Sequence, residues 1–359
     1  MKSRNLSRIL ALVLMLALVF SLAACSSSAP AAEAPAAEAP AAEAPAAEAP
    51  AAEAPTTAFP EKPINFYVAA GAGGAMDVSL RVLIPYLEDE LGVDVAINNI
   101  SGAGGWVCYA DVLNKPADGY TITSYANSNF FGLYNPTSQI EGDINDWCFL
   151  ANAVTDANAL YTNKDSEVQT LEQFIEYCTT NTDVLIGTTS IGFDDHTAYM
   201  KLASAIPGML ENTSALPASN VTEVVTNQLG GFQDFMVANV GDYNSVKDSL
   251  NIICVFSEER SPLVPDVPTF NELAAELGLD ASVTACTHRG YLIRSGVDPE
   301  VYDILCDAFE KAMANPEYLA QLEELFFVPN CVVGEDAQKL IMDDLASFQE
   351  IVPLLTAQG

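Results

Sequence analysis

Basic side chains are scarce in this chain. Its 359 residues include 14 Lys and Arg against 48 Asp and Glu, for a formal net charge of −34 at pH 7. A field of that sign argues against nucleic acid and anionic lipid surfaces as partners. It does not exclude an anionic ligand, because the donors of a pocket can outweigh a screened surface field.

Histidine is rarer still, and the patterns of common enzymes are absent. The two histidines, His196 and His288, are far apart and do not form a His-Glu-x-x-His zinc pattern. Ser190 lies in no nucleophile-elbow pattern. The glycines at 71–74 lack the Lys-Ser/Thr of a phosphate loop and the spacing of a dinucleotide fingerprint. We therefore expect no enzyme, no catalytic residue, no metal and no cofactor.

The cysteines do not suggest a disulfide framework. Besides Cys25 there are seven, an odd number without close spacing, which argues against both disulfide pairing and a zinc site. After residue 24 the chain also lacks an apolar run long enough to span a bilayer.

The N-terminus has the pattern of a signal peptide. Residues 1–24 have a basic start, then an apolar run over residues 9–20. Leu22-Ala23-Ala24-Cys25 resembles the bacterial lipobox, which implies cleavage before Cys25 and a lipid on its sulfur; ordinary secretion is the alternative. Residues 31–55 are five copies of Ala-Ala-Glu-Ala-Pro, and residues 25–58 are predicted to be an extended tether, since proline at every fifth position prevents a continuous helix.

A strand, a glycine turn and a helix follow one another at residues 64–90. The run 64–69 predicts a buried strand, residues 71–74 a tight turn, and Asp77 lies at the start of an amphipathic helix. The first N–H groups of such a helix have no intrahelical acceptor, and the helix dipole is positive there, so the turn can bind an anion.

A second junction of this kind is expected at residues 186–196, with a helix from 194 to 205. Strands at 64–69, 93–97 and 120–125 with helices between them predict a parallel sheet. Residues 127–156 look less regular, and a second α/β unit is expected to begin near Leu160. Two helix N-termini that face each other across a cleft could grip a ligand at both ends.

Beyond the tether, the sequence resembles the extracytoplasmic receptors of tripartite tricarboxylate transporters, often called Bug receptors. The most specific match is Arg260-Ser261-Pro262 followed by Pro-Asp-Val-Pro-Thr at residues 265–269. Shorter matches, in the family's order and spacing, occur at residues 59–64, 70–77 with Arg81, 98–105, 116–121, 229–231 and 315–317.

The resemblance implies a type II periplasmic-binding fold, in which two α/β domains close on a small carboxylate. We expect domain I to comprise residues 59–157 and 284–359, and domain II residues 158–283. The implied ligand contacts come from the two junctions: Ala70, Gly71, Gly73, Gly74, Ala75 and Asp77 from the first, and Thr188, Thr189, Ser190, Asp195 and His196 from the second. The implied partners are membrane permease subunits, and the implied protein is a monomer held outside the cell by its lipid.

Two departures from the family pattern leave the ligand class open. The usual Val-Pro-Tyr-Lys-Gly is replaced at residues 216–220, and the second junction carries Asp194 and Asp195 before His196. These carboxylates could pair with the ammonium of an amino acid, but capping of the helix is the commoner use and is what we expect. A sensor of the same fold, an amino-acid receptor and a receptor of another transporter class remain alternatives.

Overall fold

A computed structural model describes residues 58–136 and 138–357 of the chain. The predicted signal peptide, Cys25 and the repeats at 31–55 lie outside the described residues. No helix in the described part is both long and apolar enough to cross a membrane.

The first three strands form the predicted parallel sheet. β1 pairs with β2 on one side and with β3 on the other, both in parallel, so that Phe66 lies between Ile97 and Ile122. Helices connect them, as the alternating pattern predicted. The elements are β1 (Ile64–Val68), α2 (Ala75–Leu91), β2 (Val95–Asn99), α3 (Trp106–Leu113) and β3 (Thr121–Ala126).

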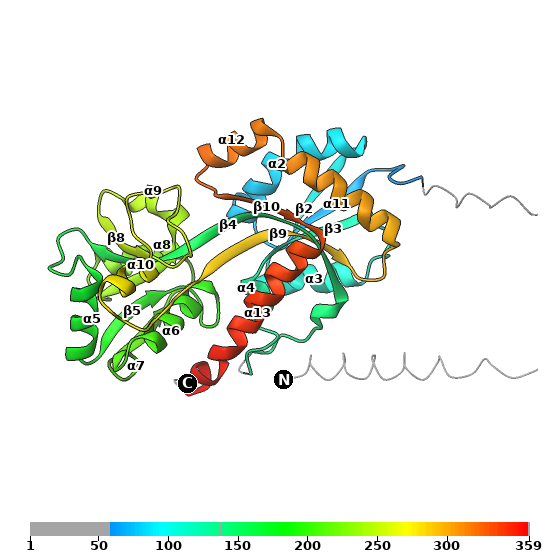
Figure 1. Cartoon of the computed structure of the whole chain (residues 1–359). Coiled ribbons are helices and arrows are strands. Elements are labelled where there is room, and N and C mark those ends of the chain that lie inside the picture. The colour runs from blue at the N-terminus through cyan, green and yellow to red at the C-terminus, as the bar shows by residue number, and fades with distance from the viewer. Residues whose placement is uncertain (1–57, 137, 358–359) are drawn as a thin grey trace, which may run out of the picture. The chain divides into compact units, whose positions relative to one another are not determined.

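Two long antiparallel strands, β4 (Trp147–Asn163) and β9 (Cys286–Arg294), cross the middle of the described fold (Figure 1). The prediction that residues 127–156 are less regular was therefore wrong for residues 147–156, which belong to β4. β4 is buried along almost its whole length, so it shows no alternation of polar and apolar residues. Polar residues such as Asn152, Asp156 and Asn158 interrupt its apolar run, and this hid the strand.

β4 changes its partners at its centre. Residues from Trp147 to Ala157 pair with β9, and those from Asn158 to Asn163 pair with β7 and β8. The predicted division at 157/158 falls at this change of partner, and the domain boundaries remain a prediction. We call the sheet region around β1–β3, β9 and β10 the first lobe, and that around β5–β8 the second lobe.

In the second lobe, β5 pairs in parallel with β6 and β7. The helix predicted at 194–205 is present with those bounds, a helix also covers residues 221–229, and Thr170 caps the helix that it precedes through a capping box. The elements are α5 (Leu171–Thr180), β5 (Val184–Thr188), α6 (Asp194–Ala205), β6 (Thr213–Pro217), α8 (Val221–Leu229), β7 (Phe235–Asn239), β8 (Leu250–Val255) and α10 (Phe270–Glu276).

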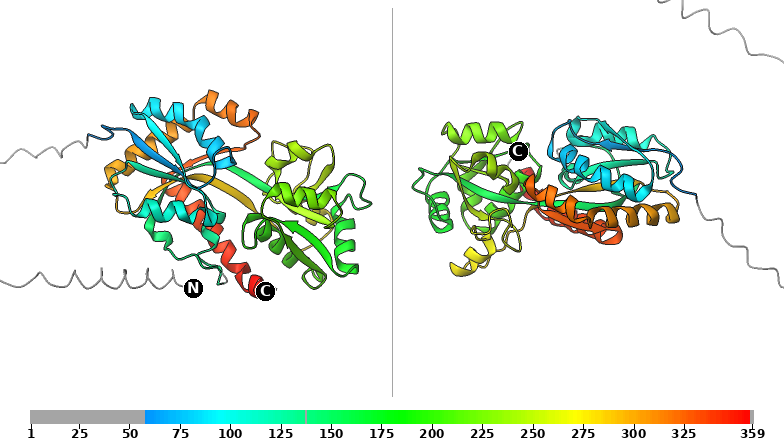
Figure 2. Two further views of the ribbon diagram at one scale, coloured as in Figure 1. Left: turned by 180° about the vertical axis from the view of Figure 1, so that it is seen from behind. Right: turned by 90° about the horizontal axis from the view of Figure 1, so that it is seen from above.

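Helices cover both faces of the first-lobe sheet. One core joins α2, α11 and α12 to residues such as Phe66, and another joins α3 and α13 to residues such as Tyr125. Figures 1 and 2 show α13 running beside the crossing strands towards the second lobe. These elements are α11 (Pro299–Met313), α12 (Pro316–Glu324), β10 (Pro329–Val333) and α13 (Gly334–Ala357). The short helices are α4 (Ser128–Phe131), α7 (Met209–Asn212), α9 (Tyr243–Val246), η1 (Ala103–Gly105), η2 (Ile144–Asp146) and η3 (Val240–Asp242).

All seven cysteines among the described residues are free. Across residues 58–136 and 138–357, no group of three His, Cys, Asp or Glu side chains could hold a metal ion.

Candidate functional site

The first glycine junction ends in a helix start that no side chain caps within the described residues. Gly74 is the N-cap residue of α2, and Val78 N donates the first helical hydrogen bond to Gly74 O. The N–H groups of Ala75, Met76 and Asp77 precede that bond and have no intrahelical acceptor. Residues 71–75 are exposed, so this positive helix end faces solvent.

Asp77 holds the first loop together and has little surface left for a ligand. Its side chain is only 2 % exposed. Oδ2 accepts from Gly73 N at 2.8 Å and from Arg81 Nε at 2.9 Å, and Oδ1 accepts from Asn99 Nδ2 at 2.9 Å. The Arg81 hydrogen bond, with those from Gly73 and Asn99, lowers the pKa of Asp77 to about 2 against the cost of burial.

The second junction is built in the same way. Asp195 Oδ2 accepts from Thr189 N at 3.3 Å, and His196 Nδ1 accepts from Gly192 N at 3.2 Å. Burial lowers the pKa of His196 to about 4, so this ring is neutral near pH 7 and can accept. The expectation that Asp194 or Asp195 caps α6 is wrong: Phe193 is the N-cap residue, and no side chain of the described residues makes the capping bond. Asp195 instead accepts from Thr189 N, in the loop that precedes the N-cap residue.

The remaining predicted residues differ in how accessible they are. Ser190 is exposed and Thr189 is half-buried. Thr188, at the end of β5, is fully buried, and its Oγ1 finds no hydrogen-bond partner in the described part of the chain. Ala70 O accepts from Asn99 Nδ2 at 3.2 Å, which fixes the exit of β1.

The two lobes approach each other at the glycine turn that follows β2. A Cβ atom at Gly104 would lie 2.9 Å from Phe193 Cζ, and one at Gly192 would lie 2.8 Å from Asn135 Nδ2. Phe193 precedes α6 and Gly104 precedes α3, so the second junction lies against the turn that follows β2. Sequence reasoning assigned neither Phe193 nor Gly104 to the site.

The carboxyl ends of strands from both lobes meet at the first residues of β9. Ala126, the last residue of β3, pairs with Arg289, and Asn158 N donates to Ala285 O. The Thr287 hydroxyl donates to Oδ1 of Asn239, the last residue of β7, at 2.9 Å. Ligands of open α/β sheets bind outside the carboxyl ends of strands, so residues 285–289 form the base of the expected cleft.

Arg289 lies on the α2 face of that base. Tyr291, two residues on, packs in the core beneath α2 and α11, and alternation places Arg289 on the same face. Ser124 pairs with Tyr291, and its hydroxyl donates to Met76 Sδ in the first turn of α2 at 3.4 Å. Arg289 pairs with Ala126, two residues nearer the end of β3. Its side chain therefore lies beyond the N-terminal turn of α2.

Carboxylates surround this arginine. Arg289 Nη1 is 3.8 Å from Asp156 Oδ2, and Gly241 N donates to Asp156 Oδ1 at 3.1 Å. The Thr287 hydroxyl donates to the Asp194 carboxylate. Burial raises the pKa of Asp156 to about 7 and that of Asp242 to about 6, although Arg289 opposes both shifts.

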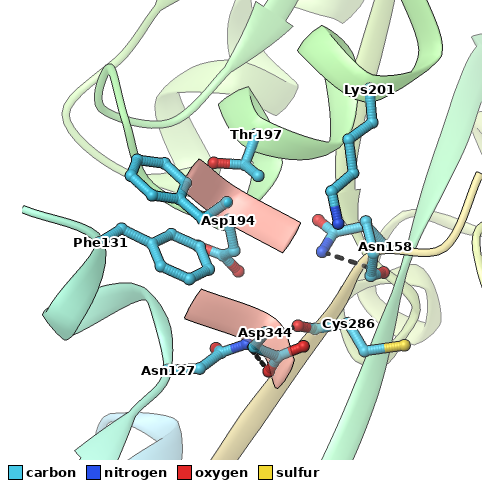
Figure 3. Close-up of a pocket in the computed structure, with 10 residues that line it drawn as sticks. Asn127, Phe131, Asn158, Asp194, Thr197, Lys201, Cys286 and Asp344 are labelled. Atoms are coloured by element: carbon cyan, nitrogen blue, oxygen red, sulfur yellow. Dashed lines mark hydrogen bonds between the residues drawn. The ribbon is translucent and has the colours of Figure 1, made fainter. Parts of the chain in front are cut away.

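A small polar pocket of about 20 Å³ lies between α6 and α13 (Figure 3). Asp194, Lys201 and Asp344 line it, together with Asn158 and Thr197. Within the described residues, Asn158 Oδ1 and Thr197 Oγ1 have no hydrogen-bond partner. A space of this size with several polar groups suits one ordered water molecule.

A larger pocket of about 670 Å³ opens elsewhere, beyond β4. Residues of the loop at 257–262, of β10 and of α13 line it, and they include Ser261, His288 and Asn330. No residue of the predicted site lines this pocket. We place the candidate site at the glycine junctions, because helix N-termini and strand ends converge there.

Sequence reasoning missed the base of the site: Asp156, Asn239, Asp242, Thr287 and Arg289. A signal was present, because Thr287, Arg289 and Tyr291 have the spacing of residues on one face of a strand. A cation on the buried face of a strand, in a chain with so many acidic residues, indicates a specific partner. Because β9 itself was not predicted, the signal had no structural context.

The fold defines a class: a two-lobed α/β fold of the periplasmic-binding type. A family model described as "Tripartite tricarboxylate transporter family receptor" matches residues 80–356. The chain belongs to this family of solute receptors, which is not a family of enzymes.

Curated relatives agree with the family match. The chain is 28 % identical over 280 residues to the "UPF0065 protein in gbd 5'region" of Cupriavidus necator, covering 76 % of this chain and 80 % of the relative. It is 24 % identical over 302 residues to "Protein BugT" of Bordetella pertussis, covering 82 % and 89 %.

Solved structures show the same fold. A TctC solute-binding protein from Polaromonas superposes with a TM-score of 0.70 at 22 % identity, covering 82 % of this chain and 99 % of that protein. MatC from Rhodopseudomonas palustris, with bound malate, gives 0.65 at 19 % identity, covering 82 % and 100 %. A second R. palustris protein, with adipate, gives 0.67 at 17 % identity, covering 83 % and 98 %.

Proposed function

We propose that this chain is an extracytoplasmic receptor that captures a small carboxylate-bearing solute and delivers it to the permease subunits of a tripartite tricarboxylate transporter. The observation that carries the proposal is the pair of helix starts, α2 and α6, each preceded by a loop whose N–H groups can bind an anion. The malate and adipate bound in two structural neighbours support a carboxylate as the ligand.

Binding proceeds by closure of the lobes about the crossing strands β4 and β9. The exposed loop at residues 71–75 and Ser190 supply N–H groups and a hydroxyl to the ligand carboxylate. Asp77, Asp195 and His196 act on the ligand indirectly, because each accepts a hydrogen bond from its own loop. Ala70, Gly71, Gly73, Gly74, Ala75, Thr188 and Thr189 complete the proposed contacts.

The proposed function includes attachment to the membrane. A lipid on Cys25 and the tether at residues 25–58 hold the receptor, a monomer, outside the cell near its permease. Mass spectrometry of the mature chain from a bacterial host should find acyl groups on Cys25. Replacement by Cys25→Ala should release the protein from the membrane fraction, and a soluble wild-type chain without acyl groups would contradict the anchor.

A thermal-shift panel tests the binding function directly. The mature chain is screened against malate, succinate, glutarate, adipate, citrate, aspartate and glutamate, each beside its neutral amide or ester. A ligand at about 100 times its dissociation constant should stabilise the fold by about 2.7 kcal/mol. The proposal expects a shift with at least one carboxylate and none with its neutral analogue. Equal shifts with both forms, or no shift at all, would overturn it.

A further inference from the structure

A buried guanidinium with a free donor lies at the base of the cleft. Arg289 is 12 % exposed, and its Nη1 atom is buried without a hydrogen-bond partner in the described part of the chain. The nearest carboxylate, Asp156, is at 3.8 Å, beyond hydrogen-bonding distance. A buried donor without an acceptor is costly, and a ligand carboxylate would satisfy it through a charge-assisted bond.

Arg289 is placed where a ligand of the two glycine junctions would reach it. The strand register sets its side chain beyond the first turn of α2. On the same strand, Thr287 hydrogen-bonds Asp194 in the first turn of α6. Along this face of β9, Thr287 contacts the start of α6, and Arg289 lies two residues nearer the start of α2.

The charges around Arg289 do not balance. Asp156, Asp242 and Asp194 interact with one another, and Arg289 is the cation that lowers the pKa of both Asp156 and Asp242. Burial nevertheless raises both pKa values well above their ordinary range. Three carboxylates with one guanidinium leave a deficit of positive charge when all are ionised.

The pocket on the far side of Asp194 also holds unpaired polar atoms. Asn158 Oδ1 and Thr197 Oγ1 line it with Asp194, and both side chains are more than nine-tenths buried. Neither atom has a partner within residues 58–136 and 138–357. Asn158 Oδ1 can only accept, and Lys201, which lines the same pocket, or one water molecule can supply the donor.

These charges discriminate between classes of carboxylate. A plain dicarboxylate would place a further negative charge beside the buried Asp156 and the half-buried Asp242 and Asp194, which is unfavourable. An α-amino acid carries a carboxylate for Arg289 and an ammonium for the acidic side chains. Building on the function proposed above, we propose that Arg289, Asp156 and Asp242 select an α-amino acid over a plain dicarboxylate.

The first test uses ligand pairs that differ only in the ammonium group. Isothermal titration of the wild-type mature chain compares aspartate with succinate and glutamate with glutarate, and a thermal-shift screen of the other amino acids accompanies it. The proposal expects the best amino acid to bind at least about 100-fold more tightly than its desamino analogue, the scale of an interaction between buried charges. Equal or tighter binding of the plain carboxylate overturns this inference and leaves the proposed function standing. No binding by any carboxylate overturns both.

The second test separates recognition from structural support. Asp242→Asn keeps the shape of the side chain but removes its charge, and should reduce the amino-acid preference roughly tenfold. Asp248→Asn, at an exposed position, is the matched control and should leave the preference unchanged. A merely structural Asp242 would weaken both members of a ligand pair equally, so an unchanged ratio would overturn its role.

Arg289 is tested in the same way, with an arginine of the same strand as control. Arg289→Gln should weaken both ligands of a pair more than tenfold, while Arg294→Gln, at an exposed position, leaves them unchanged. Melting temperatures measured without ligand show whether each variant is folded. Wild-type affinity in a folded Arg289→Gln protein would remove Arg289 from the site.

Discussion

Individual side chains at both junctions hydrogen-bond the loop that precedes their own helix. Asp77 accepts from Gly73 N, Asp195 from Thr189 N, and His196 from Gly192 N. In each case a residue in the first turn of a helix binds the loop that precedes it. The position of these residues at a helix start could be predicted from sequence. Their partners could not, because the direction of a side chain depends on the path of the loop.

The support that Asp77 gives to the first loop can be tested by substitution. Asp77→Ala removes three hydrogen bonds to a buried carboxylate and should lower the free energy of unfolding by about 1–3 kcal/mol. Ligand affinity should fall too, because the loop at residues 71–75 loses its support. Asp89→Ala, at an exposed position in the same helix, is the control.

The pH dependence of the Asp77 effect has a defined sign. The folded-state pKa of about 2 is below the ordinary 3.8, so the stabilisation is present above pH 3.8 and is lost as pH falls towards 2. Urea unfolding should therefore give a constant difference between wild type and Asp77→Ala from pH 8 to roughly pH 5. A difference that disappears within that range would show that the Asp77 carboxylate is not the cause.

At the scale of elements, the sequence predicted those with local signals. Thr170 and Thr269 each form a capping box, and Asp298 caps the helix that begins at Pro299. Thr170 predicts a helix at residues 171–178, and Asp298 with Pro299 predicts one that runs to about residue 314, whereas the helix after Thr269 was missed. The strands β4, β6, β9 and β10 were also missed, because their pairing is non-local and β4 is buried without alternation. The base of the site was lost with β9, so only its two loops could be predicted.

Gly290 shows how closely the crossing strands pack. A Cβ atom there would lie 2.0 Å from Ala151 O and 2.8 Å from Asn152 Cα, both in the backbone of β4. Gly290→Ala should therefore push β9 from β4 and lower the free energy of unfolding by about 3 kcal/mol or more. Gly71→Ala is the control for stability, since a Cβ atom there meets nothing within 4 Å. Equal chemical-denaturation midpoints for the two variants would refute this packing argument.

At the scale of the whole described fold, buried titratable groups gather along β4, β9 and the elements against them. Asp156 and Arg289 occupy the α2 face, while His288 and Asp344 lie on the α13 face. Burial raises the pKa of Asp344 to about 7 and lowers that of His288 to about 4. Asp344 is thus largely protonated between about pH 4 and 7, where a surface aspartate is ionised. His288 is neutral between about pH 4 and 6.5, where a surface histidine is charged. We therefore expect the acidic groups packed against the crossing strands to make the stability of this fold depend on pH near neutrality.

Asp344 allows that coupling to be measured. Asn127 Nδ2 donates to its Oδ2 at 2.7 Å, His288 Nε2 lies at 3.4 Å, and Lys201 and Asp343 also act on its charge. Its folded pKa exceeds the ordinary 3.8, so its contribution is full at low pH and is lost as pH rises through about 7.

Acidification from pH 8 to pH 6 should accordingly stabilise the wild-type chain relative to Asp344→Asn by about 1 kcal/mol, because only the wild type takes up this proton. The two histidines, each with a folded pKa of about 4, oppose the trend, and both stay neutral in the folded wild type over this range. Asp336→Asn, at an exposed position on α13, should follow the wild type. Thermal unfolding of the three ligand-free proteins at pH 6, 7 and 8 measures the difference. Parallel curves for wild type and Asp344→Asn would mean that Asp344 stays ionised throughout and that the coupling resides in other groups of the crossing strands.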